Sequence, residues 1–137
     1  MKVFNDLNIP KEEYFLTGSR ALDTEEIKFS TDNSDYDYVV LITQRHHIID
    51  YLVSSQIQID YSCYNGGFKF TLDGKTYNII TTIYCEFKAW REALYILRYL
   101  ISVDKFYAVA LTNKFSRYCC YESLRAFIKT MLSLGKT

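Results

Sequence analysis

The sequence lacks the cysteine spacing that holds a zinc ion or a compact disulfide framework. Its four cysteines are Cys63, Cys85, Cys119 and Cys120, and no two of them form a C-x-x-C pair. Reduced thiols in a cytoplasm are the simplest interpretation. The chain also lacks the apolar leader of a signal peptide, and no apolar stretch approaches the roughly 20 residues that span a membrane. We therefore expect a cytoplasmic protein with no membrane partner.

The sequence also has no net charge, and it has few residues that would break it into separate segments. Sixteen basic residues balance 16 acidic ones, which leaves no overall electrostatic attraction to duplex nucleic acid. A small nucleotide or a protein is the easier partner. Pro10 is the only proline, and no repeat, linker or low-complexity segment interrupts the 137 residues. This length and continuity indicate one domain, residues 1–137.

Periodicity in the chain predicts an α+β fold. Apolar, aromatic and β-branched runs predict strands at about 13–17, 36–43, 57–64, 67–72 and 76–83. Helical spacing predicts a short helix after Gly18 and helices at about 44–53, 86–102, 104–112 and 116–133. The expected architecture is a mixed sheet core at about 13–83, flanked by helices. A helical C-terminal part at about 86–134 is expected to pack on that sheet.

The phrase Phe15-Leu16-Thr17-Gly18-Ser19-Arg20 indicates a strand, a tight turn and the start of a helix. Glycine lets the backbone approach a ligand closely and adopt angles that a side chain would forbid. Ser19 at a helix start would lie where free N–H groups favour an anion such as phosphate. The alternative is an ordinary strand-to-helix turn in which Ser19 is the N-cap.

The phrase Ser34-Asp35-Tyr36-Asp37-Tyr38 leads into the apolar run 39–42. Side chains alternate along a strand, so Asp35 and Asp37 share one face. Two carboxylates at the head of a buried strand repel each other, and a divalent cation such as Mg²⁺ or Mn²⁺ relieves that repulsion. The spacing also suits a two-metal site. The alternative is an acidic turn whose aspartates are solvated.

Gly-Ser after one apolar strand and Asp-x-Asp opening a second resembles the signature of the DNA polymerase β-like nucleotidyltransferase superfamily. The chain is most similar to its short, single-domain members from bacteria and phages. The resemblance covers about the first 80 residues and implies a nucleoside triphosphate as partner. It also implies Asp35 and Asp37 as catalytic metal ligands. Gly18, Ser19 and Arg20 would then be nucleotide-binding residues, and a phage-encoded protein would act in the host cytoplasm.

The sequence departs from that signature at the third carboxylate, which the family places on a later central strand. The matching run is Thr76–Thr82, and its aligned residue is Asn78, a neutral amide that cannot take a proton. Asn78 is then expected to bind the nucleotide, with Asp60 on the preceding predicted strand as a substitute metal ligand. The spacer from Ser19 to Asp35 is also longer than is usual in the family.

Three functions remain open from the sequence. The first is a Mg²⁺-dependent enzyme that transfers a nucleotidyl group to a hydroxyl on a protein or small molecule. The second is a catalytically inactive binding module that sequesters a nucleotide or inhibits a protein, such as a phage accessory factor. The third is an unrelated α+β domain in which the two phrases coincide by chance.

Overall fold

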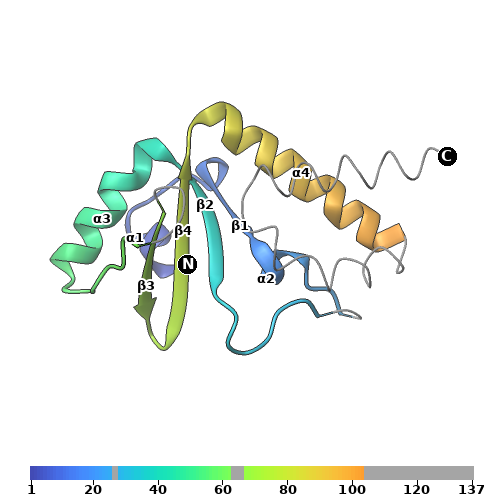
Figure 1. Cartoon of the computed structure of the whole chain (residues 1–137). Helices are drawn as coiled ribbons and strands as arrows, with labels where there is room; N and C mark the ends of the chain where they lie inside the picture. Colours follow the sequence, from blue (N-terminus) through green and yellow to red (C-terminus); the bar gives the residue numbers. More distant parts are fainter. Residues whose placement is uncertain (26–27, 63–66, 104–137) are drawn as a thin grey trace.

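A four-stranded mixed sheet forms the centre of the protein (Figure 1). The structure, a computed structural model, describes residues 1–25, 28–62 and 67–103. The strands are β1 (Tyr14–Thr17), β2 (Tyr36–Leu41), β3 (Phe68–Leu72) and β4 (Lys75–Thr82). Their order across the sheet is β1-β2-β4-β3. β2 and β4 are parallel, and the outer pairs β1–β2 and β3–β4 are antiparallel.

Helices cover both faces of the sheet (Figure 1). On one face lie α1 (Lys2–Asp6) and α3 (Arg45–Ser54), and on the other lie α2 (Gly18–Leu22) and α4 (Tyr84–Val103). Two short 3₁₀ turns, η1 (Lys11–Glu13) and η2 (Ile42–Gln44), precede β1 and follow β2. The α+β class predicted from the sequence is therefore confirmed.

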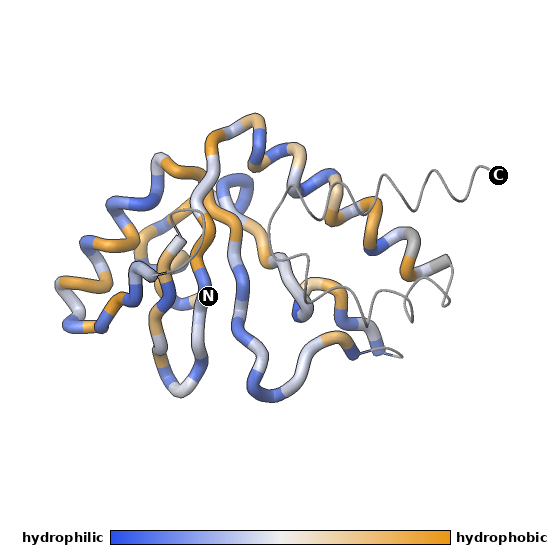
Figure 2. The backbone as a smooth tube through the Cα atoms, viewed as in Figure 1, coloured by the Kyte–Doolittle hydropathy of each residue, from blue (hydrophilic) through white to orange (hydrophobic). Residues whose placement is uncertain are grey.

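Each face of the sheet has its own hydrophobic core. Val39 faces α2 and α4, whereas Val40, the next residue of β2, faces α1 and α3, and both are fully buried. This alternation follows from the pleat of the strand. Figure 2 shows hydrophobic residues (orange) along α3 and where the central strands meet the helices. Burial on both faces explains why β2 has an unbroken apolar run rather than an alternating one.

α4 packs on the sheet through one stripe of apolar side chains, as its sequence pattern predicts. The members of the stripe are all buried: Phe87, Trp90, Leu94, Leu97 and Ile101. β3 and β4 are joined by Asp73 and Gly74, whose φ angles are 53° and 75°. Two successive positive φ values define the tight hairpin turn that the Asp-Gly pair predicts. This hairpin fixes the register in which β3 meets β4.

The strand predicted at 57–64 is wrong for the described residues 57–62. Only Asp60 pairs there, through an isolated bridge to Lys69 of β3. The alternating Ile57 and Ile59 instead pack against the core beneath α3. The run predicted at 36–43 also ends early, because the chain turns into η2 after Leu41 and leaves Ile42 48% exposed.

Some expectations fall on residues that the structure does not describe. The helices predicted at 104–112 and 116–133 lie there, as does the part of the expected helical region beyond Val103. Among the helices in the described ranges, none combines the length and apolar character required to traverse a lipid bilayer.

Candidate functional site

Polar side chains form a row across the sheet, on the face that carries α2 and α4. The strand registers place Thr17 opposite Asp37, Asp37 opposite Asn78, and Asn78 opposite Lys69. Asp60 extends the row through its bridge to Lys69. Residues opposite one another on adjacent strands share a face. The four strands and the segment around Asp60 therefore contribute to one polar strip.

Gly18 and Asp37 are in close contact at one end of this strip. A Cβ atom placed on Gly18 would lie 2.2 Å from Asp37 Oδ2. Gly18 also has a φ of +72°, a conformation that residues with side chains rarely adopt. The Gly-Ser turn and the Asp-x-Asp strand, which the sequence links only by their order, are thus brought together. Both the backbone angle and the contact require glycine at this position.

Ser19 and Arg20 follow in α2, which has only five residues. Such a short helix has a weak dipole, so the sequence argument from a helix N-terminus carries little weight here. Ser19 is half-buried beside Gly18. What the turn provides is a backbone close to a carboxylate rather than a strong helix end.

Asp37 is the most buried carboxylate of the strip. Burial raises its pKa above the usual 3.8, and the negative charge of Asp35 raises it further. A hydrogen bond from Asn78 and the charge of Lys69 act in the opposite direction. Asn78 Nδ2 donates to Asp37 Oδ1 over 3.2 Å. A cation near Asp37 would therefore offset an unfavourable charge that the fold itself creates.

Asn78 occupies the position opposite Asp37, where the resemblance expects a third carboxylate. Its Oδ1 atom is buried and has no hydrogen-bond partner in the described part of the chain. A buried carbonyl oxygen without a partner is costly, and such an atom calls for a ligand, a water or an ion. Asn78 thus donates to Asp37 through its Nδ2 atom and keeps one unused acceptor, its Oδ1 atom, within the strip.

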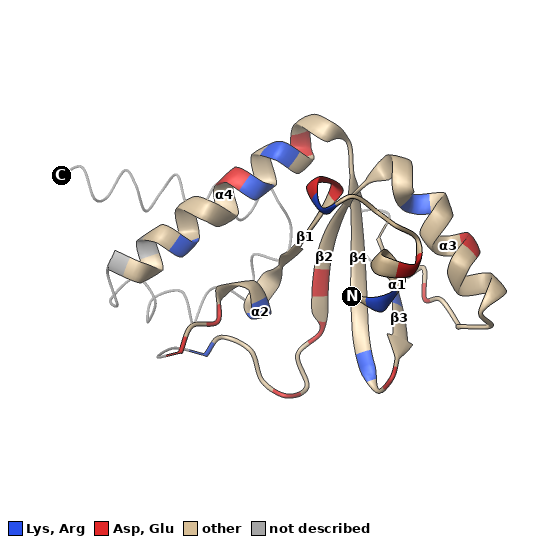
Figure 3. Cartoon of the chain, turned by 180° about the vertical axis from the view of Figure 1, so that it is seen from behind, with Lys and Arg blue, Asp and Glu red and all other residues tan. Residues whose placement is uncertain are grey.

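Asp35 lies just before β2 and forms an ion pair with Lys69. The Lys69 Nζ atom is 3.1 Å from Asp35 Oδ2, and the two side chains are 39% and 32% exposed, Lys69 first. Figure 3 shows the acidic residues (red) on β2 and in the loop leading to it. Sequence reasoning missed Lys69. The signal was available, since Lys69 alternates with Phe68 and Phe70 and must therefore face the other side of the sheet.

Arg20, which the resemblance implies as a nucleotide-binding residue, holds the loop between α2 and β2. Its Nε and Nη2 atoms donate to the Ser34 carbonyl over 3.1 and 2.9 Å, and Nη2 also donates to the Thr31 carbonyl over 3.2 Å. The guanidinium lies 4.0 Å from the centre of the Tyr36 ring. Through these contacts Arg20 positions the backbone immediately before Asp35.

Two contacts from α4 hold β1 and α2 in place. The Trp90 indole Nε1 donates to Thr17 Oγ1 over 3.1 Å, and both side chains are buried. Arg98 Nε donates to the Ala21 carbonyl at the end of α2 over 2.8 Å. The apolar stripe of α4 includes Trp90, but that pattern gives no sign of its hydrogen bond to the residue before Gly18. That bond links the helix stripe to the geometry of the site.

The residues present fit a divalent cation at the Gly18 end of the strip. Asp35, Asp37 and the Asn78 carbonyl oxygen are the hard oxygen ligands that Mg²⁺ prefers. No group of three or more histidine, cysteine or acidic side chains with metal-binding geometry occurs in residues 1–25, 28–62 and 67–103. A cation here would therefore share two carboxylates, with a bound phosphate completing its ligands.

Asp60 lies too far along the strip to join that cation. Three strand spacings of about 4.8 Å each separate it from Asp37. Its Oδ1 atom accepts hydrogen bonds from the Ser62 backbone N–H and hydroxyl, over 2.9 and 2.6 Å. The substitution of Asp60 for the third carboxylate fails for this geometric reason.

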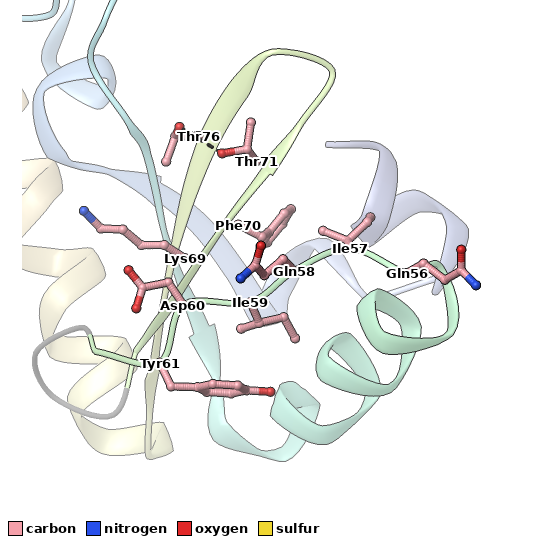
Figure 4. A pocket seen from close by; sticks show the side chains of 10 residues that line it. All are labelled: Gln56, Ile57, Gln58, Ile59, Asp60, Tyr61, Lys69, Phe70, Thr71 and Thr76. Atoms are coloured by element: carbon pink, nitrogen blue, oxygen red, sulfur yellow. Dashed lines mark hydrogen bonds between the residues drawn. The ribbon is translucent and has the colours of Figure 1, made fainter.

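A hollow of about 750 Å³ opens beside β3, next to the Lys69 end of the strip (Figure 4). The segment 56–61 forms one wall, and Lys69, Phe70, Thr71 and Thr76 form the other. Thr71 and Thr76 face each other with their hydroxyl oxygens 3.4 Å apart. The lining of the hollow therefore mixes apolar side chains with neutral hydroxyl groups, and it shares Lys69 and Asp60 with the strip.

Neither the models of known protein families nor the curated proteins give a match to this chain.

Proposed function

We propose that the protein is a nucleotidyltransferase-fold protein that binds a nucleoside triphosphate as its Mg²⁺ or Mn²⁺ complex and transfers the nucleotidyl group to a hydroxyl. The observation that carries this proposal is the contact between Gly18 and Asp37. It brings the two phrases of the resemblance side by side, so a phosphate bound at the Gly-Ser turn would lie next to the Asp37 carboxylate. Support also comes from the antiparallel β1–β2 pair, which joins the two phrases side by side.

Asp35 and Asp37 would hold the cation. Asn78 directs its Nδ2 atom to Asp37 in the metal-free protein, so its Oδ1 atom would face the ion only after the amide turns. When bound, the cation would supply charge neutralisation for the phosphates and for the group that leaves. Gly18 and Ser19 would offer backbone N–H groups to the phosphates, because no side chain at Gly18 blocks their approach. Arg20 would act indirectly by holding the loop before Asp35.

Transfer of the nucleotidyl group needs positioning and charge stabilisation more than covalent chemistry by the protein. An acceptor hydroxyl would attack the α-phosphorus from the side opposite the leaving pyrophosphate. The absence of net charge favours a protein or small-molecule acceptor over a nucleic acid. A cytoplasmic location, in a host cell for a phage protein, accords with a nucleotide substrate.

One observation favours the second candidate, a binding module without chemistry. Asn78 stands opposite Asp37 and donates a hydrogen bond to it, so the residue in that position cannot accept the proton of an attacking hydroxyl. In this candidate the same residues bind the nucleotide, and the outcome is sequestration or inhibition of a partner.

The experiment that tests the proposal measures nucleotide binding and transfer separately. Full-length protein is incubated with Mg²⁺ or Mn²⁺ and each α-labelled nucleoside triphosphate, beside the variant Asp37→Asn. Metal-dependent binding that Asp37→Asn loses would support the site, and label transfer would identify the enzyme. Binding without transfer selects the module. Equal binding by both proteins would overturn the site.

A further inference from the structure

Lys69 stands between two carboxylates, that of Asp60 at one end of the strip and that of Asp35 just before β2. Its backbone N–H donates to the Asp60 carbonyl over 2.9 Å, and the Asp60 N–H donates to the Lys69 carbonyl over 2.8 Å. Its side chain reaches the other way, with Nζ 3.1 Å from Asp35 Oδ2. The charge of Lys69 also lowers the pKa of Asp60, after the larger effect of hydrogen bonds from Ser62.

The Lys69 ammonium therefore occupies a carboxylate oxygen that a metal ion would use. A lysine ammonium is a compact point charge on a flexible stem, so it can change partners without any backbone movement. A divalent cation held by Asp35 and Asp37 would repel the ammonium at this distance. Lys69 must then leave Asp35 when the ion enters.

Asp60 is placed to receive it. Figure 4 shows the side chains of Lys69 and Asp60 projecting to the same side of the sheet. The Asp60 carboxylate is held in a fixed orientation because its Oδ1 atom accepts two hydrogen bonds from Ser62. A carboxylate that is already oriented loses little further freedom when it gains an ammonium partner.

We propose that Lys69 is an exchangeable counter-ion that pairs with Asp35 in the metal-free protein and moves to Asp60 when a divalent cation binds. This inference rests on the proposed function, because it requires a cation at Asp35 and Asp37. Asp60 lies too far from Asp37 to bind the same cation, but it lies next to Lys69. Its proposed role is therefore to form an ion pair with Lys69 and not to bind the metal. Binding of an ion at β2 would then change the partner of Lys69 at the other end of the strip, in the wall of the hollow.

The test measures Mn²⁺ affinity by electron paramagnetic resonance of the free ion, using the full chain. The proteins are the wild type, Lys69→Met, Asp60→Asn and the double variant. Lys75→Met and Asp73→Asn are matched controls. Lys75 carries the same charge on β4 and contacts the Tyr36 ring on the other side of the sheet, 5.6 Å from its centre. Asn is also compatible with the tight turn at position 73.

Exchange predicts that Lys69→Met binds Mn²⁺ more tightly and Asp60→Asn binds it less tightly, each on the order of fivefold, a coupling typical of contacting residues. Asp60→Asn should then have almost no effect in the Lys69→Met background, because no ammonium remains to be received. Both controls should stay near the wild-type affinity. No step of this test requires catalytic activity.

Two results would overturn the inference, and they differ from failure of the proposed function. If Asp60→Asn weakens binding equally with and without Lys69, Asp60 acts through its charge alone. If Lys69→Met leaves the affinity unchanged while Asp35→Asn removes binding, the metal site stands without exchange. If neither the wild type nor Lys69→Met binds Mn²⁺, the proposed function itself falls, and the inference falls with it.

Discussion

The backbone of Gly18 lies against the carboxylate of Asp37, so closely that a Cβ on Gly18 would be 2.2 Å from Asp37 Oδ2. The contact joins the end of β1 to the face of β2 on which Asp37 lies. It depends on a residue without a side chain at a φ of +72°. The role of Gly18 is therefore specific to this site and can be separated from the general cost of a positive φ.

Gly18→Ala should displace Asp37 and abolish binding of the metal–nucleotide complex. Gly74→Ala is the matched control, because Gly74 has a φ of +75° but nothing within 4 Å of an added Cβ. Both variants should lose about 1 kcal/mol of stability from the strained backbone angle. Only Gly18→Ala should lose nucleotide affinity in equilibrium binding. Similar affinities in the two variants would show that the contact has no part in binding.

Asp37→Asn should stabilise the metal-free protein at neutral pH. Burial and the Asp35 charge raise the pKa of Asp37 in the folded state above the unfolded value of 3.8. The folded state therefore binds the proton more tightly, and the free energy of unfolding falls as pH rises from 3.8 through the folded pKa. Below pH 3.8 the carboxyl is protonated in both states, so this destabilisation is absent.

Denaturant unfolding of the wild type and Asp37→Asn across pH measures this difference directly. The variant should be more stable at pH 7, and the gap should close below pH 3.8. Saturating Mg²⁺ should reverse the order by stabilising the wild type alone, since a ligand stabilises the state that binds it. A gap that stays constant with pH would show that the charge of Asp37 is not its cause.

Asn78→Asp should restore the third carboxylate and separate the two candidate functions. In the metal-free protein it should lower stability, because a carboxylate replaces the amide that donates to Asp37 over 3.2 Å. With Mg²⁺ and nucleotide, a proton acceptor at this position should raise label transfer by about 100-fold, the lower range for general base catalysis. Asn78→Ala is the control that removes the amide without adding charge.

Transfer that is strong in the wild type and unchanged in Asn78→Asp would show that the enzyme needs no carboxylate at position 78. Transfer that appears only in Asn78→Asp would show that the natural chain is a binding module, and that its other site residues still support catalysis. Both outcomes are read in the same assay, and metal-dependent nucleotide binding confirms that the variant is folded.

Trp90→Phe should destabilise the protein by about 1–3 kcal/mol, because it leaves the buried Thr17 hydroxyl without the indole donor. Thr17→Val removes the same bond from the other side. A double-mutant cycle in urea should give a coupling of about 0.5–1.5 kcal/mol, the usual net value of one hydrogen bond. Additive effects would mean that the bond contributes nothing to the position of β1.

Much of the fold could be predicted because the sequence pattern of a single segment is enough to specify many of its helices, strands and turns. The stripe from Phe87 to Ile101 specifies α4, and Asp73-Gly74 specifies a tight turn, in each case without reference to distant residues. For the segment 57–62 the same reasoning predicted a strand, but only Asp60 pairs with the sheet. Ile57 and Ile59 alternate with polar residues, a pattern typical of a strand. The same alternation also allows both side chains to pack against the core without pairing in the sheet.

The sequence selects single residues of the candidate site but does not reveal the contacts between them. Gly18, Asp35 and Asp37 were selected by their local phrases, whereas Lys69 and Thr17 belong to the site only through strand register. Register depends on the whole sheet, so no local pattern reveals it. The local phrase around Arg20 likewise gives no sign of its hydrogen bonds, since the carbonyls it binds lie 11 and 14 residues away in the sequence.

The central claim is that Gly18, Asp35 and Asp37 form one site for a metal–nucleotide complex. The most direct measurement is isothermal titration of the full chain with each nucleoside triphosphate, with and without Mg²⁺, for the wild type and Asp35→Asn/Asp37→Asn. We predict saturable binding that requires Mg²⁺ and is lost in the double variant. Binding that persists unchanged in the folded double variant, or no binding by the wild type with any nucleotide, would contradict the account.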